Sequence, residues 1–185
     1  MRELLNQFAI QIAQGHTEIY NEFSLQHEFG IFLRSHLKEM KVQFERNVSF
    51  FFPKVSHFIK KEIDITIFSP DKKRLHSAFE LKYPRNGQYP EQMFSFCKDI
   101  AFAEQLRNSG FEKTYFIVFA DDRLFYEGSS DGIYSYFRGS NILNGTVKKP
   151  TGSKNDSVSI VGQYKIEWHN VRNGMKYALV ETQIT

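Results

Sequence analysis

An acidic and a basic residue interrupt an apolar segment near the middle of the chain. Glu80 and Lys82 stand two residues apart within LHSAFELKY (75–83), so in a β-strand both side chains emerge on the same face. Asp64 lies on the polar side of the preceding segment EIDITIF (62–68). Two carboxylates and an ammonium group near a core are costly unless something compensates for their desolvation. A divalent cation would do so, since Mg²⁺ prefers one or two carboxylates, retained waters and a phosphate oxygen.

These residue types would support metal-assisted hydrolysis of a phosphate ester. The backbone carbonyl of Leu81, between Glu80 and Lys82, could add a metal ligand. A metal held in this way polarises a phosphodiester and lowers the pKa of a bound water. We expect Lys82 to orient or deprotonate that water, or to stabilise the charge that develops at the phosphorus.

The chain before these residues predicts two amphipathic helices and a strand. Apolar residues recur at helical spacing over residues 2–14 and again around 22–40. The period then changes, because VQFERNVSFFF alternates and is rich in Val and Phe, which predicts a strand from about residue 43. The turn SPDKK separates 62–68 from 75–83, so these two strands should form a hairpin with adjacent polar faces.

The best-defined predicted helix follows, at residues 90–109. Pro90 suits its first position and Gly110 suits its end. Residues 113–120, KTYFIVFA, form a nearly continuous apolar strand, which is typical of a strand covered on both faces and paired in parallel through a crossover. The order of helix, three strands, helix and strand predicts an α/β fold, with a mixed central sheet flanked by helices.

The region 121–185 is predicted to add further β-strands. RLFYEG, GIYSYFRG, VSIVGQYKIEW and KYALVET have the composition of short strands. The polar segment 138–157 is rich in Gly, Asn and Lys and is predicted to be a long loop. No linker splits the 185 residues, so we expect one domain, with a core at about 22–120 and a C-terminal β elaboration.

The spacing of Asp64 and, sixteen residues later, Glu80-Leu81-Lys82 resembles the motif of the PD-(D/E)XK nuclease superfamily. The predicted order over residues 22–120 matches the αβββαβ core of its restriction-endonuclease-like fold. The resemblance implies a metal-dependent nuclease in which Asp64 and Glu80 bind Mg²⁺, with Mn²⁺ as a substitute. It further implies that Lys82 positions the attacking water and stabilises the transition state. One departure is that Ile63 stands where the motif has proline.

The resemblance also nominates residues outside the two strands. Many members carry a further Glu on the helix before the strands, for which Glu28 is the candidate. The helix after the motif often adds a polar active-site residue, and Gln92 is the candidate for that position. Arg85 and Gln88, in the loop that leaves the catalytic strand, are candidates for nucleic-acid contact. The alternatives are a solvated helix face for Glu28, an ordinary first-turn helix position for Gln92, and a plain strand-to-helix connection for Arg85 and Gln88.

Composition excludes some other kinds of site. Cys97 is the only cysteine, so neither an intrachain disulfide nor a Cys-based zinc site can form. His27-Glu28 does not begin an HExxH motif, because residue 31 is Ile. The net charge of +3 permits a polyanionic partner without requiring one. No apolar run reaches transmembrane length and the N-terminus lacks a signal-peptide core, so we expect a cytoplasmic protein without membrane association.

DNA is the expected substrate, on the family resemblance alone. A catalytically inactive module that keeps the fold and binds nucleic acid or a protein partner is the main alternative. A third alternative is a structural domain in which Asp64, Glu80 and Lys82 form a salt-bridge cluster. The C-terminal strands and the 138–157 segment are candidates for determining substrate shape or forming a homodimer interface.

Overall fold

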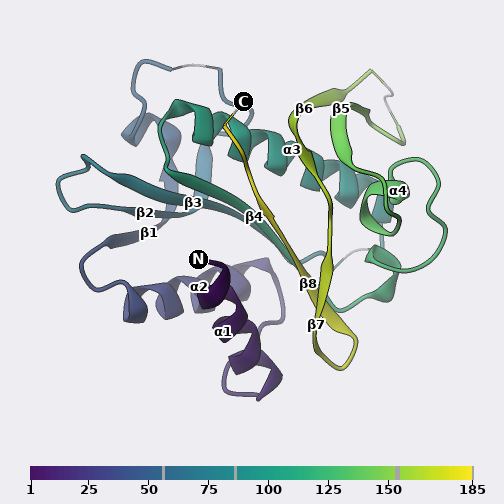
Figure 1. Ribbon diagram of the computed structural model, residues 1–185, viewed down its shortest axis with the longest axis horizontal. Coiled ribbons are helices and arrows are strands. Elements are labelled where there is room, and N and C mark those ends of the chain that lie inside the picture. Colours follow the sequence, from purple (N-terminus) through teal and green to yellow (C-terminus); the bar gives the residue numbers. More distant parts are fainter. Residues whose placement is uncertain (56, 86, 153–154, 185) are drawn as a thin grey trace.

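A six-stranded mixed sheet forms the centre of the computed structural model (Figure 1). The structure describes residues 1–55, 57–85, 87–152 and 155–184. The strand order is β1-β2-β3-β4-β8-β7, in which β3 and β4 run parallel and the other neighbours run antiparallel. The molecule is therefore an α/β fold with a mixed central sheet, as the sequence predicts.

The elements up to β4 follow the expected order along the chain. They are α1 (Arg2–Ala13), α2 (Glu22–His36), β1 (Lys41–Asn47), the 3-10 helix η1 (Val48–Phe50), β2 (Glu62–Phe68), β3 (Leu75–Lys82), α3 (Tyr89–Ser109) and β4 (Lys113–Ala120). The later elements are the 3-10 helix η2 (Arg123–Phe125), α4 (Tyr134–Phe137), β5 (Leu143–Lys148), β6 (Ser157–Tyr164), β7 (Trp168–Arg172) and β8 (Met175–Glu181).

Helices cover both faces of the sheet (Figure 1). Phe79 and Leu81 of β3 belong to the apolar core shared with α1 and α2. Ala78 of the same strand packs in the core that contains Phe102 of α3. Because side chains alternate along a strand, Glu80 and Lys82 emerge with Ala78 on the face covered by α3.

A reciprocal cap determines where α2 begins. The Asn21 side chain accepts a hydrogen bond from the Ser24 amide at 2.7 Å, and the Ser24 hydroxyl accepts one from the Asn21 amide at 3.1 Å. Glu22 therefore lies in the first turn of the helix. The helix ends at His36, earlier than predicted, because the chain turns between Leu37 and Met40 before entering β1.

Local hydrogen bonds favour short helices, so one predicted strand is shorter than expected and two others are wrong. The strand predicted from residue 43 ends at Asn47, whose side chain accepts from the Ser49 amide at 2.9 Å and starts η1. RLFYEG contains η2, because Asp122 accepts from the Leu124 amide at 3.0 Å. GIYSYFRG likewise forms the short helix α4.

The C-terminal region completes the central sheet instead of lying outside it. Strand β8 pairs with β4, and β7 pairs with β8 at the sheet edge. The predicted loop at 138–157 contains β5, which pairs with β6 in a separate hairpin beside α3 (Figure 1). None of the helices in the described part of the chain has the length and apolar character needed to cross a membrane.

Candidate metal centre

Strands β2 and β3 stop pairing where the two predicted carboxylates lie. Their register ends at Ile65 opposite Phe79, so the next pair in it would be Asp64 and Glu80. The amide of Leu81 instead donates a hydrogen bond to Oδ2 of Asp64 at 2.7 Å. The amide and carbonyl of one residue point to the same edge of a strand, so the Leu81 carbonyl also lies on the β2 side of β3.

A buried glutamine from α2 holds the backbone of Asp64 from the other side. Nε2 of Gln26 donates to the Asp64 carbonyl at 2.8 Å and also to the carboxylate of Glu45. Glu45 lies on β1 between the residues that pair with Ile65 and Ile63, and its φ of +47° interrupts the regular strand. The hydrogen bonds of Gln26 therefore fix Asp64 at a local irregularity of the sheet.

Two lysines, Lys60 and Lys82, form one cluster around the end of β3 with four acidic residues, which are Asp64, Glu80, Asp99 and Glu22. Nζ of Lys60 contacts Oε2 of Glu80 and lies 3.1 Å from Oδ1 of Asp99. Nζ of Lys82 lies 2.8 Å from Oε1 of Glu22 and 3.6 Å from Oδ2 of Asp99. Asp99 of α3 thus joins the two lysines, and the start of α2 supplies the outer carboxylate.

Burial raises the pKa of two carboxyl groups in this cluster, Glu80 and Asp64. Burial raises the pKa of Glu80, and the neighbouring charge of Asp64 raises it further. Burial also raises the pKa of Asp64 to about 6, although Lys60 opposes the change. Oε1 of Glu80 is buried without a hydrogen-bond partner. The two carboxylates are therefore crowded and incompletely neutralised, which is the condition that a divalent cation relieves.

Lys82 remains charged at neutral pH. Burial lowers the pKa of Lys82, but the carboxylates of Asp99 and Glu22 outweigh this effect and hold the pKa above its ordinary value. An ammonium group has no lone pair with which to accept a proton. The geometry therefore favours orientation and charge stabilisation by Lys82 over deprotonation of water.

The structure brings together Asp64, Glu80, Leu81 and Lys82, as predicted, but not Glu28. Glu28 is half-buried on α2, and its side chain makes no hydrogen bond or ion pair with any residue that the structure describes. Glu22, six residues earlier on the same helix, reaches Lys82 instead. Six residues of helix turn a side chain through about 600°, so Glu28 leaves α2 in a different direction from Glu22.

Three further predicted residues lie outside the cluster. The Gln92 side chain makes no hydrogen bond within the described ranges, whereas Asp99, seven residues later and on the same face of α3, reaches both lysines. Arg85 is exposed and pairs with Asp121 at 2.7 Å. Gln88 is exposed at the residue that precedes α3, and its carbonyl accepts from the Gln92 amide.

Three residues of the cluster, and the glutamine that holds the Asp64 backbone, were not predicted to take part in the site. They are Glu22, Gln26, Lys60 and Asp99. Gln26 and Asp99 interrupt the apolar stripes of their helices, and both are buried, so a polar residue within a core stripe is the signal that could have found them. Lys60 lies in a loop, where no periodic pattern indicates the direction of a side chain.

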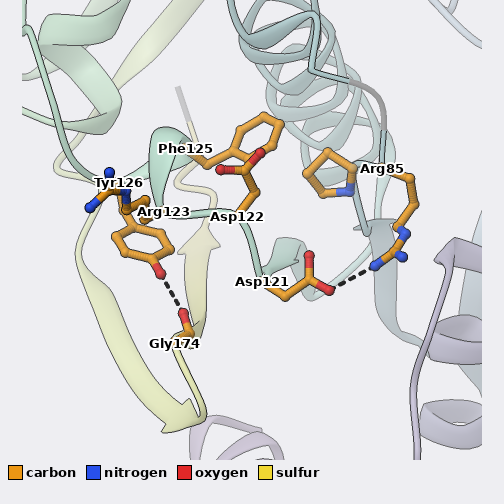
Figure 2. Close-up of a pocket in the computed structure, with 8 residues that line it drawn as sticks. Arg85, Asp121, Asp122, Arg123, Phe125, Tyr126 and Gly174 are labelled. Atoms are coloured by element: carbon orange, nitrogen blue, oxygen red, sulfur yellow. Dashed lines mark hydrogen bonds and ion pairs between the residues drawn. The ribbon is translucent and has the colours of Figure 1, made fainter.

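A polar cavity of about 610 Å³ lies beyond the carboxyl ends of β3 and β4 (Figure 2). Its lining includes Pro84 and Arg85, which follow β3, and Asp121 and Asp122, which follow β4. Arg85 and Asp121 form an ion pair within this lining (Figure 2). Crevices at the carboxyl ends of parallel strands are frequent ligand sites in α/β folds.

The donor atoms fit a magnesium ion held by few protein ligands. In the ranges that the structure describes, no three His, Cys, Asp or Glu side chains gather into a metal-binding group. Mg²⁺ does not need one, since it commonly keeps several waters beside one or two carboxylates. Oxygen donors are present in the partnerless Oε1 of Glu80, the carboxylate of Asp64 and the carbonyl of Leu81.

Comparisons with protein-family models, with curated proteins and with solved structures find no match to this chain. A functional conclusion therefore depends on the residues and their geometry.

Proposed function

We propose that this protein is a metal-dependent nuclease with a restriction-endonuclease-like core of the PD-(D/E)XK type. The observation that carries the proposal is the separation of β2 from β3 at Asp64 and Glu80, with Lys82 beside them on the α3 face. The order α2-β1-β2-β3-α3-β4, with an antiparallel β2–β3 pair and a parallel β3–β4 pair, agrees with the αβββαβ core.

Asp64, Glu80 and the Leu81 carbonyl would hold the metal. A bound Mg²⁺ supplies positive charge that polarises the phosphodiester and favours ionisation of a coordinated water. Glu80 suits the role because its Oε1 has no partner in the described structure. Asp64 suits it because its backbone and one carboxylate oxygen are already fixed, which leaves Oδ1 free of hydrogen bonds with the described residues.

Lys82 would position the attacking water and stabilise the negative charge that develops on the phosphate. Its side chain is largely buried, with 14% of its surface exposed, so its charge acts in a region of reduced dielectric. Asp99 and Glu22 hold this ammonium group in place and are positioning residues.

DNA is the proposed substrate, and Arg85 and Gln88 are the proposed contacts to its backbone. Arg85 is exposed and lines the cavity at the carboxyl ends of β3 and β4, so a phosphate could compete with Asp121 for its guanidinium group. Gln88 is exposed in the same connection between β3 and α3.

The main competing function is a catalytically inactive module. The ion pairs of Lys60 and Lys82 with Glu80, Asp99 and Glu22 favour it in one respect, because they partly neutralise the cluster without a metal. In that case the six residues would stabilise the fold, and the protein would bind a nucleic acid or a protein partner without cleaving a substrate.

Cleavage assays separate the two functions. The purified protein is incubated with linear, circular and branched DNA and with RNA, over a range of Mg²⁺ and Mn²⁺ concentrations and with EDTA. We expect metal-dependent cleavage that falls at least about 100-fold in Asp64→Asn and in Lys82→Met. Glu62→Gln is the matched control, since Glu62 is an exposed carboxylate on the same strand as Asp64. Cleavage that survives in both site variants, or no cleavage of any substrate, contradicts the proposal.

A further inference from the structure

The proposed metal needs the buried carboxylate of Glu80, and Lys60 already places a positive charge beside that carboxylate. Its Nζ contacts Oε2 of Glu80 and lies 3.1 Å from Oδ1 of Asp99. The other cluster lysine, Lys82, stands on a central strand, whereas Lys60 belongs to the segment that leads into β2. The two ammonium groups therefore differ in how they are held.

The side chain of Lys60 can leave Glu80 without moving the backbone that carries it. Gln105 of α3 binds the backbone on one side, accepting from the Ile59 amide at 2.8 Å. On the other side, the Lys61 carbonyl accepts from the Val48 amide at 2.8 Å. The Lys60 side chain is 30% exposed, against 14% for Lys82, so it has a direct route to water. Rotation about its side-chain bonds is sufficient to release it.

The net charge of the cluster is also negative enough to be balanced by a divalent cation. Four carboxylates and two ammonium groups give a net charge of −2 when all are ionised. Glu80 is fully buried, and one of its oxygens has no partner even with Lys60 in place. The Lys60 ammonium group therefore gives a partner to only one of the two carboxylate oxygens of Glu80.

We infer that Lys60 is an internal cation that a divalent metal displaces from Glu80, so that this ion pair and metal binding are mutually exclusive. The inference rests on the proposed metal site and adds to it a residue that sets metal affinity. Displacement follows from Coulomb repulsion, because an ammonium group and a metal ion on the same carboxylate would lie only a few ångströms apart in a region of low dielectric. The released ammonium group reaches water.

Metal titration of two lysine variants tests the competition. Lys60→Met keeps an unbranched side chain of similar length and removes the charged Nζ, which lies 5.7 Å from the centre of the Phe102 ring. Lys61→Met is the matched control, because Lys61 is exposed and makes no side-chain ion pair with the described residues. We expect Mn²⁺, measured by calorimetry without substrate, to bind Lys60→Met at least about tenfold more tightly than the wild type or Lys61→Met. Equal or weaker binding in Lys60→Met overturns the inference.

Lysine acetylation of the wild-type protein tests the displacement and does not depend on the variant folding. With a limiting amount of acetic anhydride, Lys60 should be acetylated slowly in EDTA and at least about threefold faster in saturating Mg²⁺. The rate rises because displacement from Glu80 returns the Lys60 amine to water. Lys61 serves as the internal reference in the same peptide. An unchanged Lys60 rate shows that the metal binds without displacing it and overturns the inference.

The two tests also separate this inference from the proposed function. If wild type and Lys60→Met bind Mn²⁺ equally well, the metal site stands and only the role of Lys60 is wrong. If neither protein binds Mn²⁺ or Mg²⁺, both the inference and the metal-dependent function are wrong.

Discussion

The carboxylate of Asp64 accepts a hydrogen bond from the backbone amide of Leu81, 2.7 Å away, where β2 and β3 stop pairing. An amide oxygen can accept the same hydrogen bond, so Asp64→Asn should keep the local structure. It also removes a negative charge beside Glu80, whose pKa is raised by burial and by that charge. We therefore expect the metal-free variant to melt higher than the wild type in EDTA, by about 3 °C or more.

The same variant should lose the response to metal. Mg²⁺ or Mn²⁺ should raise the melting temperature of the wild type, because a ligand that binds only the folded state stabilises it. The rise should be much smaller in Asp64→Asn and unchanged in Asp71→Asn, an exposed carboxylate in the turn before β3. Equal rises in all three proteins would favour a salt-bridge cluster over a metal site.

The stability of the metal-free protein should depend on pH through Asp64. Burial raises its pKa from 3.8 to about 6, so between these values the folded protein binds more protons than the unfolded chain. The contribution of Asp64 to the free energy of unfolding is therefore largest below about pH 4 and falls as the pH rises through 6. In EDTA, the difference in melting temperature between Asp64→Asn and the wild type should grow from pH 5 to pH 7.5. A constant difference would place the pKa of Asp64 near its ordinary value.

Gly30 allows α2 to pack closely on β1, next to the bond between Gln26 and Asp64. A Cβ at this position would lie 1.9 Å from a ring carbon of Phe44. We expect Gly30→Ala to lower the free energy of unfolding by about 1–3 kcal/mol in urea denaturation. Phe44→Leu, which shortens the obstructing side chain, should recover part of that loss when combined with Gly30→Ala. Full stability of the single variant would mean that the Phe44 ring or α2 shifts readily to make room.

Glu104 attaches the β5–β6 hairpin to α3. Its buried carboxylate accepts from the amides of Val161 at 3.1 Å and Gly162 at 2.7 Å, and from the Tyr164 hydroxyl at 2.8 Å. Glu104→Ala leaves these donors without their partner, so we expect a loss of about 2–4 kcal/mol on unfolding, against about 1 kcal/mol for Tyr164→Phe. The loss in the double variant should be smaller than the sum of the two single losses, because each single variant already removes the hydrogen bond between Tyr164 and Glu104. Full additivity would mean that the two side chains do not interact.

The sequence by itself determined the core elements around the site. Ranges 62–68 and 113–120 are confirmed as β2 and β4, the β2–β3 hairpin is confirmed as antiparallel and the β3–β4 pair as parallel. These predictions succeed because a strand's period of two and a buried strand's apolar run are local properties. The same period puts Glu80 and Lys82 on one face.

The tertiary structure alone decided which other residues reach that face. Lys60 comes from a loop, Glu22 from the first turn of one helix and Asp99 from the middle of another. Each of them reaches Glu80 or Lys82 of β3 only in the folded chain. No local pattern in the sequence indicated that β8 pairs with β4. Contacts between distant segments depend on how amphipathic faces pack, and a local pattern of residues does not specify which partner each face receives.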